Sequence, residues 1–390
     1  MARSRLLQHI DSLPALMADL IMPLARAVAA VVPASRCAQI SRVFLTGCGD
    51  SHHAAVGAAL AFRQFAHVSC IPLTALSCSR YHAPYLADSR RAGETDLLVA
   101  ISVSGGVTRT IEALDLCRQA GAWTLAITGN DQTPLAQAGE SVIETRVPPL
   151  PADTPEIVVP GMRSYVASQL ALYLLAIQLG QGRGHLTKMA ADSLRWEIAG
   201  MANNAAQTIA NCDPRAHALC QTWTDATHFV FCGGGPNYGA ALFNAAKMLE
   251  ASGDPALAQD MEEWAHLQYF SREPHTPTLL ISAGAADNDR VQEIAIAATT
   301  IGRRVALIAP TTTAAADTLP LQNTLPIAAP VRECFSPLLT TLPGALLAAH
   351  RAAETGEPYF RAFGGGRSIE GGGGISRIRT SHRQTRLNQP

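Results

Sequence analysis

The two halves of this 390-residue chain repeat one alternation of apolar runs and helical segments. Apolar runs predicted to be strands begin at residues 43, 97 and 123 in the first half, and at 228, 278 and 304 in the second. The intervals between them are 54 and 26 residues in the first half, and 50 and 26 in the second. Each half also contains segments with helical periodicity between these runs. Matching order and spacing predict a duplicated unit of strands and helices.

Near-continuous apolar strands that alternate with helices are typical of parallel strands buried on both faces. The sequence therefore predicts the α/β class, with two tandem doubly wound parallel sheets. We expect leading helices over 1–35, a first domain over 36–195, a second over 196–350, and an irregular Gly/Arg-rich tail over 351–390. Ligands of such sheets bind outside the carboxyl ends of the strands, so we expect a binding site in the loops that follow the apolar runs.

The charge balance argues against two classes of partner. Lys and Arg number 30 and Asp and Glu number 31, which gives a net charge of −1. Binding of nucleic acid over a broad surface needs an excess of basic residues, and so does attraction to an anionic membrane, so neither partner is predicted. The most apolar long stretch, 13–32, is interrupted by Asp19, Pro23 and Arg26, and no membrane-spanning segment is expected.

The nine cysteines and twelve histidines form no pattern typical of a disulfide framework or a metal centre. The cysteines are odd in number and include no Cys-x-x-Cys pair, which favours buried reduced thiols in a cytoplasmic protein. The adjacent His52 and His53 cannot share a helix face, and no His-Glu-x-x-His motif is present. We expect neither a metal nor another cofactor.

Two turns rich in glycine and hydroxyl side chains follow predicted strands of the first half. They are GCGDS at 47–51 and SVSGGVT at 102–108, and a predicted helix follows each. Glycine lets the backbone approach a ligand closely, and a helix N-terminus offers free N–H groups, so each turn suits an anion. Helix capping explains either turn alone. The two turns together favour a phosphate site, and neither matches a nucleotide-binding glycine motif.

A lysine and a glutamate mark a second candidate site in the second half. Lys247 and Glu250 lie on the predicted helix 238–251, which follows the glycine turn at 233–235. A spacing of three places both side chains on one helix face. From the residues alone, an ordinary surface ion pair worth ~0.3 kcal/mol is the favoured interpretation.

These turns and the duplication resemble the sugar isomerase (SIS) domain. The similar segments are FLTGCGDSHHAA at 44–55, AISVSGGVTRTIEAL at 100–114 and FVFCGGGPNYGAALFNAAKMLE at 229–250. From about residue 7 to 347, the chain resembles the double-SIS isomerase half of glutamine–fructose-6-phosphate aminotransferase and its relatives, which include amino-sugar isomerases, deaminases and deglycases. The resemblance implies two SIS domains of flavodoxin-like type.

The resemblance assigns the hydroxyls that bind phosphate to Ser51, Ser102 and Ser104. The predicted phosphate- and substrate-binding set is completed by neighbouring positions in the turns: Gly49, Asp50, Gly105, Thr108, Arg109, Gly235 and Asn237.

The chain departs from the family pattern within these turns, at Asp50, Val103 and Val107. A carboxylate beside a phosphate is repulsive unless it is paired or points away. Arg109 is a candidate partner for Asp50, and equally a candidate phosphate ligand. An unphosphorylated or acidic sugar therefore stays open as an alternative.

The resemblance also implies catalytic roles in the second half. Glu250 would move a proton between C1 and C2 of the open-chain sugar, which needs a carboxylate with a raised pKa and a nearby cation, here Lys247. His266 aligns with the ring-opening histidine, which in that family reaches the neighbouring subunit's site and implies a homodimer. A satisfied loop histidine is the alternative. Phe243 replaces another carboxylate of the family helix.

The family's C-terminal lysine motif is not visible in this chain. We expect that some of the tail arginines fold over the substrate instead, because the surrounding glycines permit close approach. The candidates are Arg361, Arg367, Arg377 and Arg379.

Three functions are carried forward. The leading hypothesis is a cytoplasmic aldose–ketose isomerase of a phosphosugar or amino sugar, working through an enediol or enediolamine and without a glutaminase domain. The first alternative is an amino-sugar-phosphate deaminase or a fructosamine-6-phosphate deglycase, which would share the first proton transfer. The second is a non-catalytic protein that binds sugar phosphates.

Overall fold

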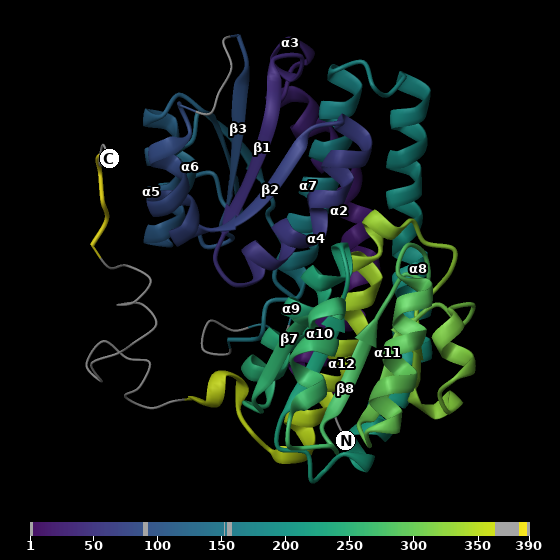
Figure 1. Ribbon diagram of the computed structural model, residues 1–390. Coiled ribbons are helices and arrows are strands. Elements are labelled where there is room, and N and C mark those ends of the chain that lie inside the picture. Colours follow the sequence, from purple (N-terminus) through teal and green to yellow (C-terminus); the bar gives the residue numbers. More distant parts are fainter. Residues whose placement is uncertain (1–2, 89–92, 152, 154–157, 363–381, 388–390) are drawn as a thin grey trace. The chain divides into compact units, whose positions relative to one another are not determined.

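The computed structural model describes residues 3–88, 93–151, 153, 158–362 and 382–387. The chain divides into two compact units. Unit 1 consists of Met1–Ala15, Pro149–Met162 and Gly200–Ala362. Unit 2 consists of Leu16–Pro148, Arg163–Ala199 and Phe363–Pro390. Each unit contains one five-stranded parallel sheet, so the predicted α/β class with two doubly wound sheets is confirmed (Figure 1). The predicted boundaries at 36, 196 and 351 stay predictions.

The sheet of unit 2 has the strand order β2-β1-β3-β4-β5. Its strands are β1 (Ile40–Gly47), β2 (Ser69–Thr74), β3 (Thr95–Ile101), β4 (Trp123–Thr128) and β5 (Ser141–Glu144). β1 pairs with β2 on one side and with β3 on the other, so the chain reverses direction across the sheet between β1 and β3. A gap between helices opens at such a switch point, at the carboxyl ends of these two strands.

The helices of unit 2 cover both faces of its sheet (Figure 1). They are α2 (Leu13–Val31, mostly in this unit), α3 (Ala34–Cys37), α4 (Asp50–Ala66), α5 (Thr108–Gln119), α6 (Pro134–Ala138) and α7 (Arg163–Gly182). A short π-helix, η1 (Ser77–His82), and a 3-10 turn, η2 (Ala83–Tyr85), lie between β2 and β3. Right-handed crossovers from β1 to β2 and from β3 to β4 run in opposite directions, which places α4 and α5 on opposite faces.

The sheet of unit 1 has the strand order β10-β9-β8-β6-β7. Its strands are β6 (Phe229–Gly233), β7 (Ala256–Asp260), β8 (Pro277–Ile281), β9 (Arg304–Ala309) and β10 (Thr324–Pro326). Counted within the unit, this is the same order as in unit 2. The switch point therefore falls between β6 and β8, and the glycine turn at 233–235 ends β6 at that point.

Helices also cover both faces of the sheet in unit 1 (Figure 1). They are α1 (Arg5–Asp11), α9 (Pro236–Ala251), α10 (Met261–His266), α11 (Asn288–Thr300) and α12 (Pro337–Thr355), with α8 (Lys188–Thr222) crossing from one unit's residues to the other's. Short 3-10 turns complete the unit: η3 (Gln268–Phe270), η4 (Ala314–Asp317), η5 (Leu321–Asn323), η6 (Glu333–Phe335) and η7 (Tyr359–Ala362).

The three strands predicted in each half are confirmed, but each sheet has two further strands at or near its edges. β2, β5 and β7 carry few consecutive buried side chains, and β10 is buried but only three residues long. A strand that is only half covered needs no continuous apolar run, so the criterion used on the sequence does not detect it.

α2 bears on the expectation that no segment spans a membrane. By length and composition it is apolar enough to cross one, and 28% of its most apolar 18 residues are buried in the structure. The interrupting residues Asp19, Pro23 and Arg26 all lie on the exposed side of the helix. A single such helix is weak support for a membrane span, because packed helices of water-soluble proteins pass the same test.

The nine cysteines are free, as the sequence indicates, and eight of them are buried. Burial raises the pKa of the Cys37 thiol to about 11 and that of Cys220 to about 12, so both stay protonated near neutral pH. Cys48, in the first glycine turn, is the exposed one.

Candidate functional site

The turn after β1 has a backbone that only glycine supports. Gly49 precedes α4 with φ 55° and ψ −128°. A Cβ at Gly47 would lie 2.6 Å from the Cβ of Ser51 and 2.9 Å from the carbonyl oxygen of Ile101. Ser51 is thereby held against the sheet in the first turn of α4, half-buried. No side chain caps the start of α4, where the N–H of Ser51 donates to the carbonyl of Cys48 at 3.3 Å, and the positive end of the helix dipole favours an anion there.

The turn after β3 is equally constrained. The N–H of Ser102 donates to the carbonyl oxygen of Ile127 at 3.0 Å, and its own carbonyl accepts from the N–H of Gly105 at 3.0 Å. Gly105 has φ 60°, and a Cβ there would lie 2.2 Å from Thr133. Ser102 is 4% exposed, whereas Ser104 is exposed. One hydroxyl therefore lines the base of the turn and the other stands at its rim.

These two turns lie together at the switch point of unit 2, because they follow the hydrogen-bonded neighbours β1 and β3. Thr108 is the first residue of α5, and no side chain caps that helix either. Hydroxyls and uncapped helix N-termini at one edge of a sheet form a suitable environment for a phosphate or another anion. The structure brings together Gly49, Ser51, Ser102, Ser104, Gly105 and Thr108, while their roles in binding stay predictions.

Arg109 does not pair with Asp50, in contrast to one interpretation of the sequence. Its guanidinium lies 2.5 Å from the carboxylate of Glu112, one turn further along α5. The Asp50 carboxylate lies 3.6 Å from Nδ1 of His53. The i, i+3 spacing on each helix explains both pairs. Arg109 stays a predicted phosphate ligand, but its charge is already shared with Glu112.

Glu112 is a buried carboxylate that the sequence interpretation overlooked. It is 0% exposed and accepts two hydrogen bonds from Arg80, at 2.6 and 3.0 Å, in addition to the contact with Arg109. The N–H of Gln384 donates to it at 2.6 Å. Burial opposes ionisation, but the hydrogen bonds from Arg80 and Gln384 outweigh it and lower the pKa of Glu112. The spacing from Arg109 to Glu112 is the one signal that the sequence contains.

In unit 1, Lys247 and Glu250 form the predicted pair on one face of α9. Lys247 is 0% exposed, and its ammonium contacts the carboxylate of Glu250, whose side chain is 30% exposed. The ammonium also lies 4.8 Å from the ring centre of Phe243, the residue that replaces a carboxylate of the family. A fully buried lysine excludes the interpretation as an ordinary surface ion pair, because burial of a charge is costly without compensation.

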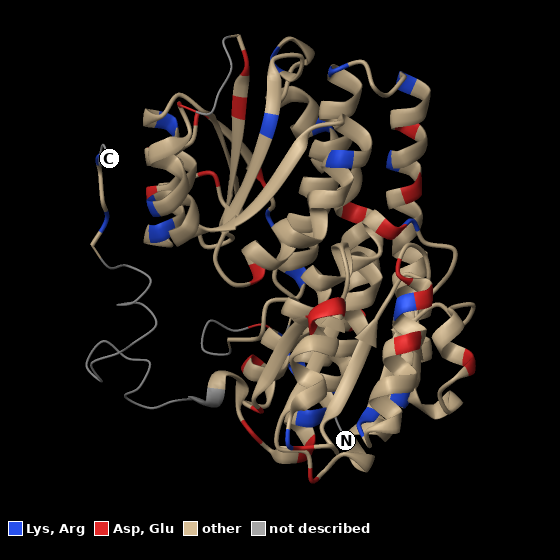
Figure 2. Ribbon diagram, in the orientation of Figure 1, with Lys and Arg blue, Asp and Glu red and all other residues tan. Residues whose placement is uncertain are grey.

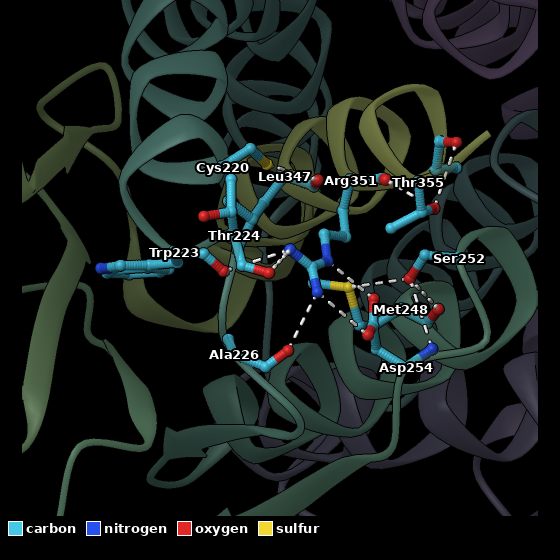
Figure 3. Close-up of polar contacts among 11 residues, drawn as sticks. Cys220, Trp223, Thr224, Ala226, Met248, Ser252, Asp254, Leu347, Arg351 and Thr355 are labelled. Carbon is cyan, nitrogen blue, oxygen red and sulfur yellow. Dashed lines mark hydrogen bonds and ion pairs between the residues drawn. The ribbon is translucent and has the colours of Figure 1, made fainter. Parts of the chain in front are cut away.

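A buried arginine anchors the carboxyl end of α9. Arg351, on α12, makes a bidentate ion pair with Asp254 at 2.9 and 3.3 Å, just after α9 (Figure 3). Its guanidinium also donates to the carbonyls of Trp223 and Ala226 at the end of α8. Ser252 closes the helix by donating to the carbonyl of Met248. Glu250 is the penultimate residue of α9 and thus lies at this fixed helix end, so its backbone position is well defined.

In the glycine turn after β6, the environment of Asn237 differs from the prediction that this residue binds substrate. Gly235 caps α9 with φ 52°, as a close approach to a ligand would require. The side chain of Asn237 is buried, and its Oδ1 accepts hydrogen bonds from Ser336 at 3.0 Å and Thr340 at 2.9 Å on and before α12. Asn237 therefore joins α9 to α12, and its predicted contact with substrate has no support from this geometry.

His266 is the last residue of α10 and stands apart from the Lys247–Glu250 pair. Its side chain is 66% exposed, and Nε2 lies 3.3 Å from Glu262. No hydrogen bond or ion pair joins it to Lys247 or Glu250 in the part of the chain that the structure describes. Its predicted role in ring opening stays a prediction.

Among the described residues, no group of three or more His, Cys, Asp and Glu side chains is placed to bind a metal. Burial, with a smaller contribution from His53, lowers the pKa of His52 to about 4, so its imidazole is neutral near pH 7. The tail arginines Arg367, Arg377 and Arg379 lie outside the described residues, and only the backbone of Arg361 is described.

A family model matches the first half of the repeat, most of which lies in unit 2. Residues 37–178 match the SIS domain family model. Over 323 residues, the chain is 27% identical to the glutamine–fructose-6-phosphate aminotransferase (isomerizing) of Gloeobacter violaceus, covering 82% of this chain and 50% of that protein. The chain spans half, or only about a third, of the length of the curated relatives that it matches.

Solved structures share the fold over most of the chain. The C-terminal domain of glucosamine-fructose-6-phosphate aminotransferase from Francisella tularensis superimposes with a TM-score of 0.74 at 19% identity, covering 90% of this chain and 96% of that one. The glucosamine-6-phosphate deaminase of Thermotoga maritima has a TM-score of 0.58 at 17% identity, covering 87% and 95%. At these identities the likeness concerns the fold.

Proposed function

We propose, from the premise that the chain is a SIS-domain protein, that it is an aldose–ketose isomerase of a phosphosugar or an amino-sugar phosphate. The phosphate would bind Ser51, Ser102 and Ser104 and the uncapped N–H groups of α4 and α5. Glu250 would take the proton from C2 of the open-chain aldose and return it to C1 through an enediol or enediolamine. Lys247 would stabilise the negative charge that develops on the sugar oxygen.

The observation that carries this proposal is the burial of Lys247 beside Glu250. An ammonium that is 0% exposed and contacts a partly exposed carboxylate is arranged to hold charge at a reaction centre. The pair Arg290–Glu293 on α11 has the same i, i+3 spacing without a fully buried cation, since its side chains are 34% and 62% exposed. It serves as the matched control.

Exchange of solvent deuterium into C1 or C2 of fructose 6-phosphate or glucosamine 6-phosphate tests the proton transfer. Glu250→Gln removes the base and should lower the exchange rate by about 10³-fold, while Glu293→Gln should leave it unchanged. NMR follows the label. Binding without any exchange in the unmodified protein would favour the non-catalytic alternative, and unchanged exchange in Glu250→Gln would remove Glu250 from the mechanism.

The deaminase and deglycase alternatives share this first step and the fold, so product analysis separates them. Release of ammonia from glucosamine 6-phosphate, or of an amino acid from a fructosamine 6-phosphate, would replace the isomerase proposal. Conversion of an aldose phosphate to its ketose without release of nitrogen supports it.

We further propose that a second copy of the chain brings His266 to the site. Three large apolar side chains follow this histidine and are exposed: Leu267 (58%), Tyr269 (40%) and Phe270 (75%). A cluster of exposed apolar side chains is typical of a contact surface, and a twofold dimer would bury it in both subunits.

Light scattering with chromatography tests the dimer. Phe270→Asp should raise the dissociation constant of the dimer at least about tenfold, because burial of the new carboxylate opposes association. Activity should fall with dimer content. Leu321→Asp, at an apolar side chain 69% exposed elsewhere in unit 1, is the control and should change neither. Full activity of a monomeric variant would contradict a shared site.

A further inference from the structure

The segment His382–Leu387 lies along α5 and does not enter the proposed reaction. Arg109 donates to the carbonyl of His382, and Gln119 donates to that of Thr385 at 2.9 Å. Leu387 packs against the core of unit 2. Since α5 rises about 1.5 Å per residue, these contacts follow the helix over ~15 Å from its start. The segment is thus attached to unit 2 at both of its ends.

A cavity of about 440 Å³ lies between this segment and η1. Its walls are Arg80 from η1 and the residues His382, Arg383, Gln384, Thr385 and Arg386. The volume lies within the range of sites that bind small molecules. Neither phosphate turn contributes a lining residue, so the cavity is separate from the site proposed above.

Positive charge is in excess around this cavity. Two guanidiniums, of Arg80 and Arg109, share the single carboxylate of Glu112. Two more, of Arg118 and Arg383, share that of Asp115, at 3.2 and 3.3 Å.

Arg386 is the fifth arginine of this group, and the described residues offer it no ion pair. Five guanidiniums therefore stand against two carboxylates, in a chain whose net charge is −1. Figure 2 shows basic residues on both α5 and the C-terminal segment.

We propose that this cavity binds a small molecule that carries a phosphate group. A phosphate monoester has nearly two negative charges at pH 7, which matches the surplus of positive charge, and arginine binds phosphate oxygens through two parallel hydrogen bonds. Arg80, fixed by Glu112, provides a rigid wall, while Arg383 and Arg386 close the other side. The site is a second anion site, in addition to that at the two glycine turns.

Isothermal titration calorimetry with inorganic pyrophosphate, at constant ionic strength, tests this proposal. We expect two binding events per chain. The double variant Arg383→Gln/Arg386→Gln, at one half-buried and one exposed side chain, should weaken one event at least about tenfold and leave the other. Ser102→Ala/Ser104→Ala should have the reverse effect. If only the event at the glycine turns were absent, that result would contradict the proposed function and leave the proposal for this cavity intact.

Matched controls keep the test specific. Arg26→Gln removes one exposed positive charge from α2 and should change neither event. A chain that ends at residue 381 should behave as the double variant does. Unchanged affinity and stoichiometry in Arg383→Gln/Arg386→Gln would overturn the proposal, as would complete loss of this event in 0.15 M NaCl, which indicates non-specific charge attraction.

Discussion

The crevices at the two switch points have nearly the same backbone and different side chains. Gly49 in unit 2 has φ 55° and ψ −128°, and Gly235 in unit 1 has φ 52° and ψ −126°. Gly105 has φ 60° and approaches Thr133, while Gly284 has φ 67° and approaches Thr313. The scaffold that positions a ligand is therefore present twice.

The side chains at the two crevices differ in charge and in hydrogen bonding. In unit 1, the hydroxyl of Ser282 donates to the carboxylate of Asp287 at 2.6 Å. That carboxylate lies beside Gly234, where a Cβ would be 3.6 Å from its Oδ2. Burial raises the pKa of Asp287, and burial together with the charge of Asp287 raises the pKa of Glu333. An anion there would meet two carboxylates, so equivalent backbones do not imply equivalent ligands.

A new carboxylate in the turn after β3 of unit 2 should have the largest effect. Ser102→Asp places a negative charge at the base of the turn after β3, and like charges at contact cost several kcal/mol. We expect the affinity for fructose 6-phosphate to fall at least about 100-fold, or ~3 kcal/mol, in calorimetry. Ser282→Ala in unit 1 should leave it unchanged. A phosphosugar that still binds to Ser102→Asp would show that the anion site lies elsewhere.

Substitution of the glycines with positive φ tests whether the two turns depend on glycine to the same extent. Gly105→Ala and Gly284→Ala should each lower the free energy of unfolding by ~2 kcal/mol, because a Cβ is strained at this φ and collides with a threonine. Gly184→Ala, at φ 79° with open space around it, should cost only ~1 kcal/mol.

Denaturant unfolding measures these free energies, and calorimetry the binding. Only Gly105→Ala should also weaken the binding of phosphosugar. If Gly284→Ala weakened the binding of phosphosugar to the same extent, the two crevices would not differ in their contribution to binding.

The smallest effect concerns the pH dependence of unit 1. The pKa of Asp287 is higher in the folded chain than its ordinary 3.8, so the folded protein holds this proton more tightly. Its contribution to stability is therefore lost as the pH rises from about 3.8 through the raised pKa. Asp287→Asn should flatten this decline and raise the free energy of unfolding at pH 7 by ~1 kcal/mol or less.

Urea unfolding between pH 4 and pH 7 measures this difference. Asp317→Asn, at an exposed carboxylate of η4 in the same unit, is the control and should keep the decline of the unmodified protein. A decline that persists in Asp287→Asn would assign it to another group, and Glu333 is the first candidate because burial also raises its pKa.

Much of the fold was predictable because its central strands are buried on both faces. β1, β3 and β4 in one sheet, and β6, β8 and β9 in the other, are continuous apolar runs, and the helices between them have clear periodicity. β2 and β7 were not predictable on this criterion, since most of their residues are only half-buried. Their positions follow from hydrogen bonding to β1 and β6.

The candidate site was predictable in part. The turns follow strands directly, so local residue types reveal them, and the spacing of Lys247 and Glu250 places both on one helix face. Burial of Lys247 depends on what packs around α9 and cannot be read from spacing. In the same way, the carboxylate Asp287 reaches the glycine turn of β6 only because β6 and β8 are neighbours.

The order of amino acids alone determined the α/β class, the switch-point turns and the candidate residues, because periodicity, glycine and hydroxyl positions act over a few residues. Tertiary structure decided which charges meet. Arg80, Glu112 and Gln384 come from segments 32 and 272 residues apart, and they share one buried carboxylate only because the folded chain brings η1, α5 and the C-terminal segment into contact. Electrostatic pairing depends on distance in space, to which separation along the chain is no guide.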